Sequence, residues 1–371
     1  MRCARTLRRE GYDGRILLVG GEATPPYNRP PLSKELLRGD LPDDLVMAEP
    51  ERWYERRGVD LMTGVSVSSL DPHARIAVTD AGHRIGFERC LIATGAAPRV
   101  LPVTGAERAL ELRTLADARR LRRAALEAGD GASAVVIGGG FIGVEVASSL
   151  AALGLQPTIV ERADRLWSGV LGSLLSGWAA NRLRDAGVAV RTESEVIAID
   201  PGGVRLGDER LPAPVIVAGV GVRPRDELAA RAGLDVDDGI ITDAAHQASH
   251  PAVWAAGDVA RVAGRRIEHW HASREGGERA ARSMLGLPLE PAPVPWTFSE
   301  VAGAAIDVVG SPEGWDDETW IEADRLVAFV EAGRVVQLAS VDSIIPAAGM
   351  RRLVAAGATI DEVRASMKPV D

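Results

Sequence analysis

The pattern best suited to chemistry is the glycine-rich run G-x-G-x-x-G at residues 138–143, which lies between an apolar run and a helical pattern. Its first glycine permits a tight turn, its second lets the backbone approach a pyrophosphate, and its third lets helix and strand pack closely. The N-terminus of the following helix attracts phosphate charge. The run therefore predicts a dinucleotide site rather than a turn without function, formed by Gly138, Gly140, Phe141, Ile142 and Gly143.

A carboxylate ends the next apolar run. Glu161 stands 18 residues after Gly143, where an acid accepts hydrogen bonds from the adenosine ribose and repels a 2′-phosphate. This spacing predicts NADH rather than NADPH as the nucleotide. The alternative stays open because Arg162 and Arg165 follow closely, and a guanidinium can hold the additional phosphate.

Lysine is rare in this chain. Lys34 and Lys368 are the only lysines among the 43 basic residues. A lysine retained inside a structured segment indicates a position where arginine would not serve, because an ammonium is a compact point charge and a guanidinium is not. Lys34 is therefore a candidate functional residue, whereas we assign no function to Lys368 in the C-terminal tail.

Three further apolar runs end in short motifs of small or acidic residues. They are Ala93-Thr94-Gly95, Gly219-Val220-Gly221 and Gly257-Asp258. Each motif is weak by itself, because glycine and aspartate are also common in ordinary turns. Their order along the chain carries the argument.

The elements that must position these residues are alternating strands and helices. Short apolar runs predict buried strands at 15–20, 89–95, 132–137, 156–161, 214–219 and 252–257, and helical patterns lie at 115–128, 142–153 and 171–186. Continuous apolar strands that alternate with helices indicate a parallel sheet covered on both faces.

The segment after a proline-rich linker at 288–295 has a different sequence pattern. It predicts an antiparallel sheet with strands at 301–310, 319–322, 326–331 and 335–341, followed by a helix at 342–356. These elements predict a small α+β domain at the C-terminal end.

Composition excludes several classes of protein. The 371 residues are 46% hydrophobic and 26% charged, which is typical of a folded chain of two or three domains. The net charge of −9 argues against a general nucleic-acid binder. Cys3 and Cys90 form no short-spaced pair or zinc motif, so we expect no disulfide framework and no metal site. The sparse cysteines and the lack of a signal peptide or membrane span favour the cytoplasm.

Taken in order, the motifs resemble the FAD-dependent pyridine-nucleotide oxidoreductases, and most of all the bacterial ferredoxin reductases of oxygenase systems. The resemblance runs from residue 1 to about residue 295, and more loosely to the end. Its specific parts are Pro26-Tyr27-Asn28-Arg29-Pro30-Pro31-Leu32-Ser33-Lys34, Ala93-Thr94-Gly95, Leu112-Arg113-Thr114, the loop from Gly138 to Glu145, Gly257-Asp258 and Glu268-His269-Trp270.

The resemblance implies a role for particular residues. It places Lys34 beside the flavin and pairs it with Glu145, and a cation there stabilises a negatively charged reduced flavin. It further implies FAD contacts from Arg113 to the phosphates, from Asp258 to the ribityl chain, from the Val67 backbone to the adenine, and from Trp270 over the flavin end. The other cofactor contacts that it implies are Arg29, Ala93, Thr94, Gly95 and Gly221.

This chain departs from the family in three places. The acid that ends the second strand of the FAD domain is displaced by one residue, so we expect Glu22 to bind the ribose. Phe298 stands where the family has a tryptophan. The family begins with a strand and a G-x-G-x-x-G loop for the FAD pyrophosphate, whereas this chain begins within the helix that follows. We expect that an internal methionine was assigned as the start of this chain. The alternative is a real truncation.

These observations predict an α/β fold with two doubly wound, Rossmann-like domains and a small α+β C-terminal domain. The FAD-binding domain is discontinuous, at 1–105 and 226–294, around an NAD-binding domain at 106–225, with the C-terminal domain at 295–371. The resemblance implies an enzyme that passes electrons from NADH through FAD to a ferredoxin-type iron–sulfur protein of an oxygenase system. The alternatives are an NADH oxidase or quinone-type reductase, and a flavin-free NADH-binding pseudo-enzyme.

Overall fold

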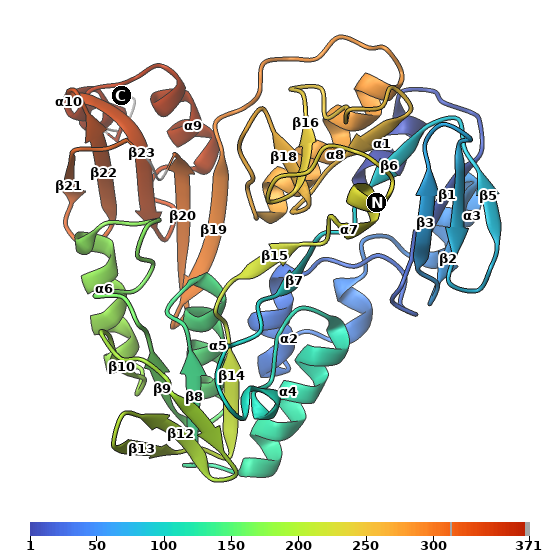
Figure 1. Ribbon diagram of the computed structural model, residues 1–371. Coiled ribbons are helices and arrows are strands. Elements are labelled where there is room, and N and C mark those ends of the chain that lie inside the picture. Colours follow the sequence, from blue (N-terminus) through green and yellow to red (C-terminus); the bar gives the residue numbers. More distant parts are fainter. Residues whose placement is uncertain (312–313, 368–371) are drawn as a thin grey trace. The chain divides into compact units, whose positions relative to one another are not determined.

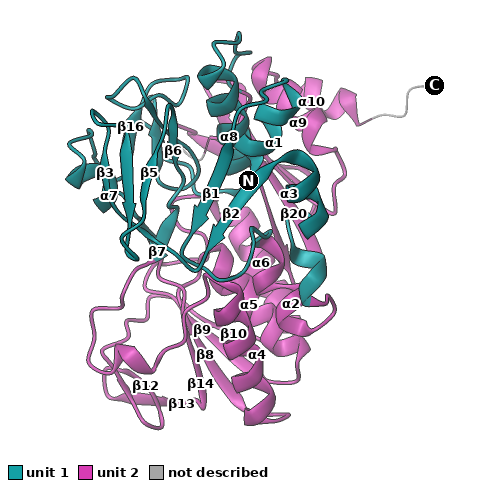
Figure 2. Ribbon diagram, turned by 90° about the vertical axis from the view of Figure 1, so that its right-hand side faces the viewer, with its two compact units in different colours: residues 1–29, 43–97, 222–292 teal, residues 30–42, 98–221, 293–371 magenta. Residues whose placement is uncertain are grey.

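The computed structural model describes residues 1–311 and 314–367 (Figure 1). The chain divides into two compact units, coloured separately in Figure 2. Unit 1 contains Met1–Arg29, Asp43–Ala97 and Val222–Ala292, and unit 2 contains Pro30–Pro42, Pro98–Gly221 and Pro293–Asp371. This division is coarser than the three predicted domains, whose boundaries stay a prediction. Lys368 lies outside the described residues.

Several strand pairs of unit 1 are parallel. β1 (Ile16–Gly20) pairs with β2 (Val59–Thr63), and β6 (Cys90–Ile92) pairs with β17 (Val253–Ala255). The long helix α8 (Trp270–Met284) packs against α1 (Arg2–Arg9). The helices approach closely at Gly277, where an added Cβ would lie 3.3 Å from the Cβ of Arg2.

Smaller elements complete unit 1. β3 (Val67–Asp71), β4 (Ile76–Thr79) and β5 (Arg84–Gly86) form an antiparallel sheet, and β16 (Ile240–Thr242) pairs with β18 (Ala260–Val262). β7 (Ala96–Pro98) pairs with β15 (Val222–Pro224) at the boundary of the unit. The remaining helical elements are η2 (Asp43–Val46), α3 (Glu51–Arg57) and α7 (Glu227–Arg231).

Unit 2 is built on a parallel sheet of four strands. Their order is β10 (Ala189–Arg191), β9 (Gln156–Val160), β8 (Ser133–Ile137) and β14 (Val215–Ala218). Four of the five residues of β8 are buried, and Ser133 is half-buried. This burial explains the continuous apolar sequence of the strand. The flanking helices are α4 (Leu115–Ala128), α5 (Phe141–Ala152) and α6 (Ser173–Asp185), which confirms the predicted strand–helix alternation.

Shorter elements surround this sheet. An antiparallel group contains β11 (Ala198–Asp200), β12 (Gly203–Leu206) and β13 (Glu209–Pro212). The segment that carries Lys34 forms η1 (Pro30–Ser33) and α2 (Glu35–Arg38), and α2 packs against α4 and α5. η3 (Ala106–Arg108) precedes α4. α4 starts where predicted because Thr114 and Asp117 form a capping box.

The C-terminal part of unit 2 is an antiparallel sheet of five strands. Their order is β19 (Trp296–Val301), β20 (Ala304–Gly310), β23 (Arg334–Val341), β22 (Leu326–Glu331) and β21 (Asp317–Glu322). α9 (Ala347–Ala355) packs against β20 and β23, and α10 (Ile360–Ser366) follows. The predicted α+β character of this segment is therefore confirmed.

Two predictions for this segment were wrong in detail. The strand expected at 301–310 is part of a hairpin, because Ala302 and Gly303 adopt φ values of 46° and 81° and turn the chain between β19 and β20. The helix expected from residue 342 begins at Ala347. Asp342 and Ser343 have φ values of 51°, which a right-handed helix does not allow, and Pro346 occupies the N-cap.

The largest core cluster of unit 2 links the parallel sheet, its helices and the C-terminal sheet. Leu150 and Leu175 from the helices and Ile306 and Phe329 from the C-terminal strands are fully buried in this cluster. The C-terminal sheet therefore packs on the parallel sheet and the helices of the same unit. Among the described residues, no helix has the length and apolar character needed to cross a bilayer.

Candidate functional site

The glycine-rich loop lies between β8 and α5 and has the geometry predicted for a dinucleotide site. Gly138 adopts φ 108°, and a Cβ there would lie 2.4 Å from the carbonyl oxygen of Gly219. A Cβ on Gly143 would lie 2.0 Å from the carbonyl oxygen of Gly138. These two glycines are therefore required by close backbone packing.

Gly140 differs from its neighbours, because an added Cβ there would meet no atom within 4 Å. It is the N-cap of α5, and no side chain of the described residues caps the first turn. Phe141 and Ile142 follow in that turn, and Ile142 is 44% exposed. Open space beside uncapped helix N–H groups is the arrangement that binds a pyrophosphate.

Glu161 follows β9 and points back to this loop. Its Oε2 accepts a hydrogen bond from the backbone N–H of Gly139 at 2.6 Å, and its Oε1 accepts one from the N–H of Ala163 at 2.7 Å. Each carboxylate oxygen has a second lone pair for a ribose hydroxyl. Arg162 is exposed, and Arg165 pairs with Asp164 at 2.7 Å.

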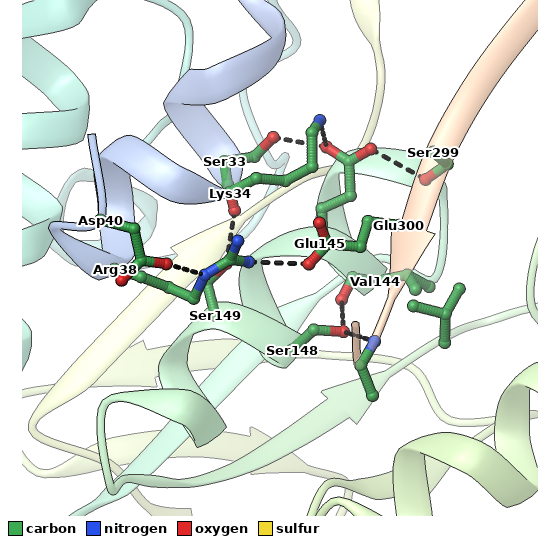
Figure 3. Close-up of polar contacts among 12 residues, drawn as sticks. Ser33, Lys34, Arg38, Asp40, Val144, Glu145, Ser148, Ser149, Ser299 and Glu300 are labelled. Atoms are coloured by element: carbon green, nitrogen blue, oxygen red, sulfur yellow. Dashed lines mark hydrogen bonds and ion pairs between the residues drawn. The ribbon is translucent and has the colours of Figure 1, made fainter. Parts of the chain in front are cut away.

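A second site in unit 2 is a buried ion pair between two residues 111 positions apart in sequence. Lys34 Nζ lies 3.0 Å from Glu145 Oε2, and the two side chains are 8% and 4% exposed (Figure 3). Lys34 lies between η1 and α2, and Glu145 is in the second turn of α5, one turn beyond the glycine-rich loop. The predicted pairing of these residues is present in the structure.

Hydroxyl groups complete the surroundings of Glu145. Ser33 Oγ donates to Oε2, and Ser299 Oγ from β19 donates to Oε1 at 2.8 Å. Ser149, one turn along α5, donates to the carbonyl oxygen of Ser33 at 2.7 Å. Lys34 Nζ also lies 5.7 Å from the ring centroid of Phe298. Sequence reasoning assigned no role to these serines, because nothing in their spacing relates Ser33 or Ser299 to Glu145.

Unit 1 holds another cluster of predicted cofactor residues at the carboxyl end of β1. Tyr27 donates to Glu22 Oε2 at 2.5 Å, and Arg29 donates to Glu22 Oε1 at 2.8 Å. The Arg29 guanidinium also lies 5.1 Å from the Tyr27 ring centroid. Glu22 and Arg29 are therefore held together, with both side chains more than one third exposed.

Other predicted residues of unit 1 occupy strand ends and a helix start. Thr94 Oγ1 donates to the carbonyl oxygen of Arg225 at 2.7 Å, and Ala93 and Gly95 flank it after β6. Asp258 accepts from Ser273 Oγ at 3.2 Å, and Trp270 begins α8 with Arg274 4.3 Å from its ring centroid. Val67 begins β3.

Two further predicted cofactor residues belong to unit 2. Arg113 is half-buried just before α4, and its backbone N–H donates to Asp117 at 3.2 Å. Gly221 adopts φ 91°, and its carbonyl oxygen accepts from the Arg99 N–H at 2.9 Å. The roles of Arg113 and Gly221 toward a cofactor stay predictions.

The two cysteines form no redox pair. Cys3 and Cys90 are free, and burial raises their pKa values to about 11 and about 12. Both thiols therefore stay protonated and are poor nucleophiles. No group of His, Cys, Asp or Glu in the described part of the chain could hold a metal ion.

The donor sets of the two units fit the two predicted cofactors. The open N-terminus of α5 and the carboxylate of Glu161 suit the pyrophosphate and ribose of NADH. The Glu22 carboxylate, the Arg29 guanidinium and the Asp258 carboxylate suit the hydroxyl and phosphate groups of FAD.

Comparison with known proteins gives consistent relatives. The chain is 37% identical to the ferredoxin–NAD(+) reductase component of the biphenyl dioxygenase system of Paraburkholderia xenovorans, over 84% of this chain and 78% of that protein. It is 35% identical to the ferredoxin reductase component of the chlorobenzene dioxygenase of a Cupriavidus strain, over 97% and 91%.

Solved structures extend the likeness to the fold. The covalent putidaredoxin reductase–putidaredoxin complex matches with a TM-score of 0.91 and 29% identity, over 96% of this chain and 90% of that one. The ferredoxin reductase of the CYP199A2 system from Rhodopseudomonas palustris matches with a TM-score of 0.88 and 31% identity, over 92% and 88%. The doubly wound architecture with a C-terminal sheet domain is thus confirmed.

The family model described as pyridine nucleotide-disulphide oxidoreductase matches residues 1–277, the part that carries the glycine-rich loop and the buried lysine. The chain belongs to the pyridine nucleotide-disulphide oxidoreductase family.

Proposed function

We propose that this protein is a ferredoxin reductase, which oxidises NADH and delivers the electrons through bound FAD to a ferredoxin-type iron–sulfur protein of an oxygenase system. The observation that carries the proposal is the likeness to ferredoxin reductase components of dioxygenase systems, at 37% and 35% identity over 84% and 97% of this chain. FAD supplies the conversion of a two-electron donor into single-electron transfers. A cytoplasmic location, favoured by the sparse cysteines, is part of this proposal.

The residues of unit 2 bind and orient the nucleotide in this proposal. The open N-terminus of α5 receives the pyrophosphate, and Glu161 accepts the ribose hydroxyls. Because its carboxylate is already fixed by two backbone N–H groups, it cannot swing away from a 2′-phosphate at low cost. NADH is therefore the preferred donor.

The pair of Lys34 and Glu145 stabilises negative charge on the reduced cofactor. In the described part of the chain, Glu145 is the one hydrogen-bond acceptor of Lys34 Nζ, so the ammonium keeps two N–H groups for a further acceptor. An ammonium in a buried place is screened little by water, and its charge therefore acts strongly on its neighbours.

The cysteines support an acceptor outside the chain. Internal disulfide chemistry needs a reactive thiol pair, and this chain has only two cysteines, both free and both with raised pKa values. The electrons therefore leave the protein for a separate carrier, and the proposed carrier is a ferredoxin.

The test is NADH-dependent electron transfer by the FAD-saturated chain. Cytochrome c reduction is measured with and without the purified ferredoxin of the biphenyl dioxygenase system, at equal reductase concentration. We expect the ferredoxin to raise the rate at least about tenfold, because in the proposed function the electrons leave the flavin through a ferredoxin-type carrier. Equal rates with and without ferredoxin, together with rapid oxygen consumption, would instead identify an NADH oxidase. A chain that does not retain FAD would support the NADH-binding pseudo-enzyme.

A further inference from the structure

Two serine hydroxyls fix the carboxylate that holds Lys34. Ser33 and Ser299 come from segments more than 260 residues apart, and both donate to Glu145, one to each carboxylate oxygen. All four residues of this group are buried, with exposed fractions of the whole residue between 3% and 6%. The group is therefore isolated from bulk water that could replace a lost hydroxyl.

The two carboxylate oxygens of Glu145 accept hydrogen bonds from different donors. Oε2 accepts from Lys34 Nζ at 3.0 Å and from Ser33, whereas Oε1 accepts from Ser299 alone among the described residues. The terminal torsion of a glutamate is intrinsically broad and twofold, so a carboxylate without a partner on one oxygen can rotate. The Ser299 hydroxyl is the contact that opposes this rotation.

The position of the ammonium follows from that of the carboxylate. A lysine ammonium ends a flexible four-carbon stem and has no directional preference of its own. Its one acceptor in the described chain is Glu145, and the Phe298 ring lies beside it at 5.7 Å. When the carboxylate rotates, Lys34 therefore follows one oxygen or the other and loses its single position.

We propose that Ser299, assisted by Ser33, is a positioning residue that fixes the Glu145 carboxylate and through it the Lys34 ammonium. This inference rests on the proposed function, in which Lys34 acts on the reduced cofactor. It assigns to β19 of the C-terminal sheet a part in the chemistry, because this strand supplies both Ser299 and Phe298.

The composition of the chain offers a direct readout. Lys34 and Lys368 are its only lysines, so a chain labelled with [ε-¹³C]lysine gives two sets of Cε–Hε NMR signals. The Lys34→Met variant identifies the set that belongs to Lys34. A fixed ammonium gives the two Hε protons of Lys34 separate shifts, and a mobile one averages them.

The experiment compares Ser299→Ala with a matched control in the oxidised, FAD-saturated chain. Ser340 is equally buried in β23 of the same sheet, and its hydroxyl has no partner among the described residues. Ser340→Ala therefore removes a buried hydroxyl without touching the carboxylate. Ser299→Thr keeps a hydroxyl at the position and should restore the wild-type spectrum.

We expect averaged Hε shifts for Lys34 in Ser299→Ala and separate shifts in Ser340→Ala and Ser299→Thr. In Ser299→Ala, the rate of flavin reduction by NADH should fall about tenfold, which corresponds to the loss of one hydrogen bond to a charged group. The KM should change little. Ser33→Ala should produce the same averaging to a smaller degree, since Oε2 keeps Lys34.

Two results would overturn the proposal. One is an unchanged Lys34 spectrum in both Ser299→Ala and the Ser33→Ala/Ser299→Ala double variant, each folded by circular dichroism. The other is the same averaging in Ser340→Ala, which would mean a general loosening of the sheet. The NMR readout needs no turnover, so an absence of ferredoxin reduction by the wild type would refute the proposed function and leave this test intact.

Discussion

Removal of the Lys34 ammonium and removal of the Glu145 carboxylate should destabilise the chain unequally. In Lys34→Met, Glu145 keeps hydrogen bonds from Ser33 and Ser299. In Glu145→Leu, Lys34 Nζ loses its one acceptor in the described chain and keeps only the Phe298 ring, while both hydroxyls lose theirs. The carboxylate is thus better supported without its partner than the ammonium is.

The geometry of the ion pair sets the size of the two losses in the free energy of unfolding. Two unit charges 3.0 Å apart attract by about 5.5 kcal/mol at an effective dielectric constant of about 20. Breaking a buried pair costs about 3–5 kcal/mol, because one charge stays buried without compensation. We therefore expect a loss in the free energy of unfolding of about 2–3 kcal/mol for Lys34→Met and about 4–5 kcal/mol for Glu145→Leu.

The assay is a double-mutant cycle of urea unfolding followed by far-ultraviolet circular dichroism, with equal slopes required for all four proteins. Lys34→Met/Glu145→Leu removes both charges, so it should lose at least about 2 kcal/mol less than the sum of the single variants. Additive losses, or a larger loss for Lys34→Met than for Glu145→Leu, would refute this reasoning.

Three further outcomes are expected. Glu161→Ala should lower the kcat/KM preference for NADH over NADPH by at least about tenfold in stopped-flow reduction, because it removes the charge that repels a 2′-phosphate; an unchanged preference would transfer this role to other residues. Burial lowers the pKa of His269 to about 4 from an unfolded value of about 6.5. Between these pH values the unfolded chain therefore binds one more proton than the folded chain. The contribution of His269 to the free energy of unfolding is complete above pH 6.5 and declines as the pH falls toward 4. His269→Gln should show a smaller decline of its urea midpoint over that range. Ferredoxin-dependent cytochrome c reduction should fall several-fold between low and high salt, since Arg119, Arg120 and Arg123 are exposed on α4 despite the net charge of −9; a salt-independent rate would exclude electrostatic docking.

Local signals in the sequence were sufficient to predict an element wherever the interactions that form it lie within that element. The helix at Leu115–Ala128 was predicted to the residue because its capping box is encoded within four positions. The buried strand before Gly138 and the helix after it were predicted within one residue for the same reason. The hairpin at Ala302–Gly303 was missed, because the apolar pattern runs on across the turn without a break.

The sequence by itself determined the family, the glycine-rich loop and the importance of Lys34, since motif spacing and the near absence of lysine are properties of the chain as written. Only the tertiary structure decided which groups hold Glu145. Ser299 stands 154 residues from Glu145, and nothing in the spacing relates them. They meet because the C-terminal sheet packs on α5 to bury apolar surface that neither could bury alone, and a carboxylate enclosed there must be matched by donors from whichever segments the packing brings to it.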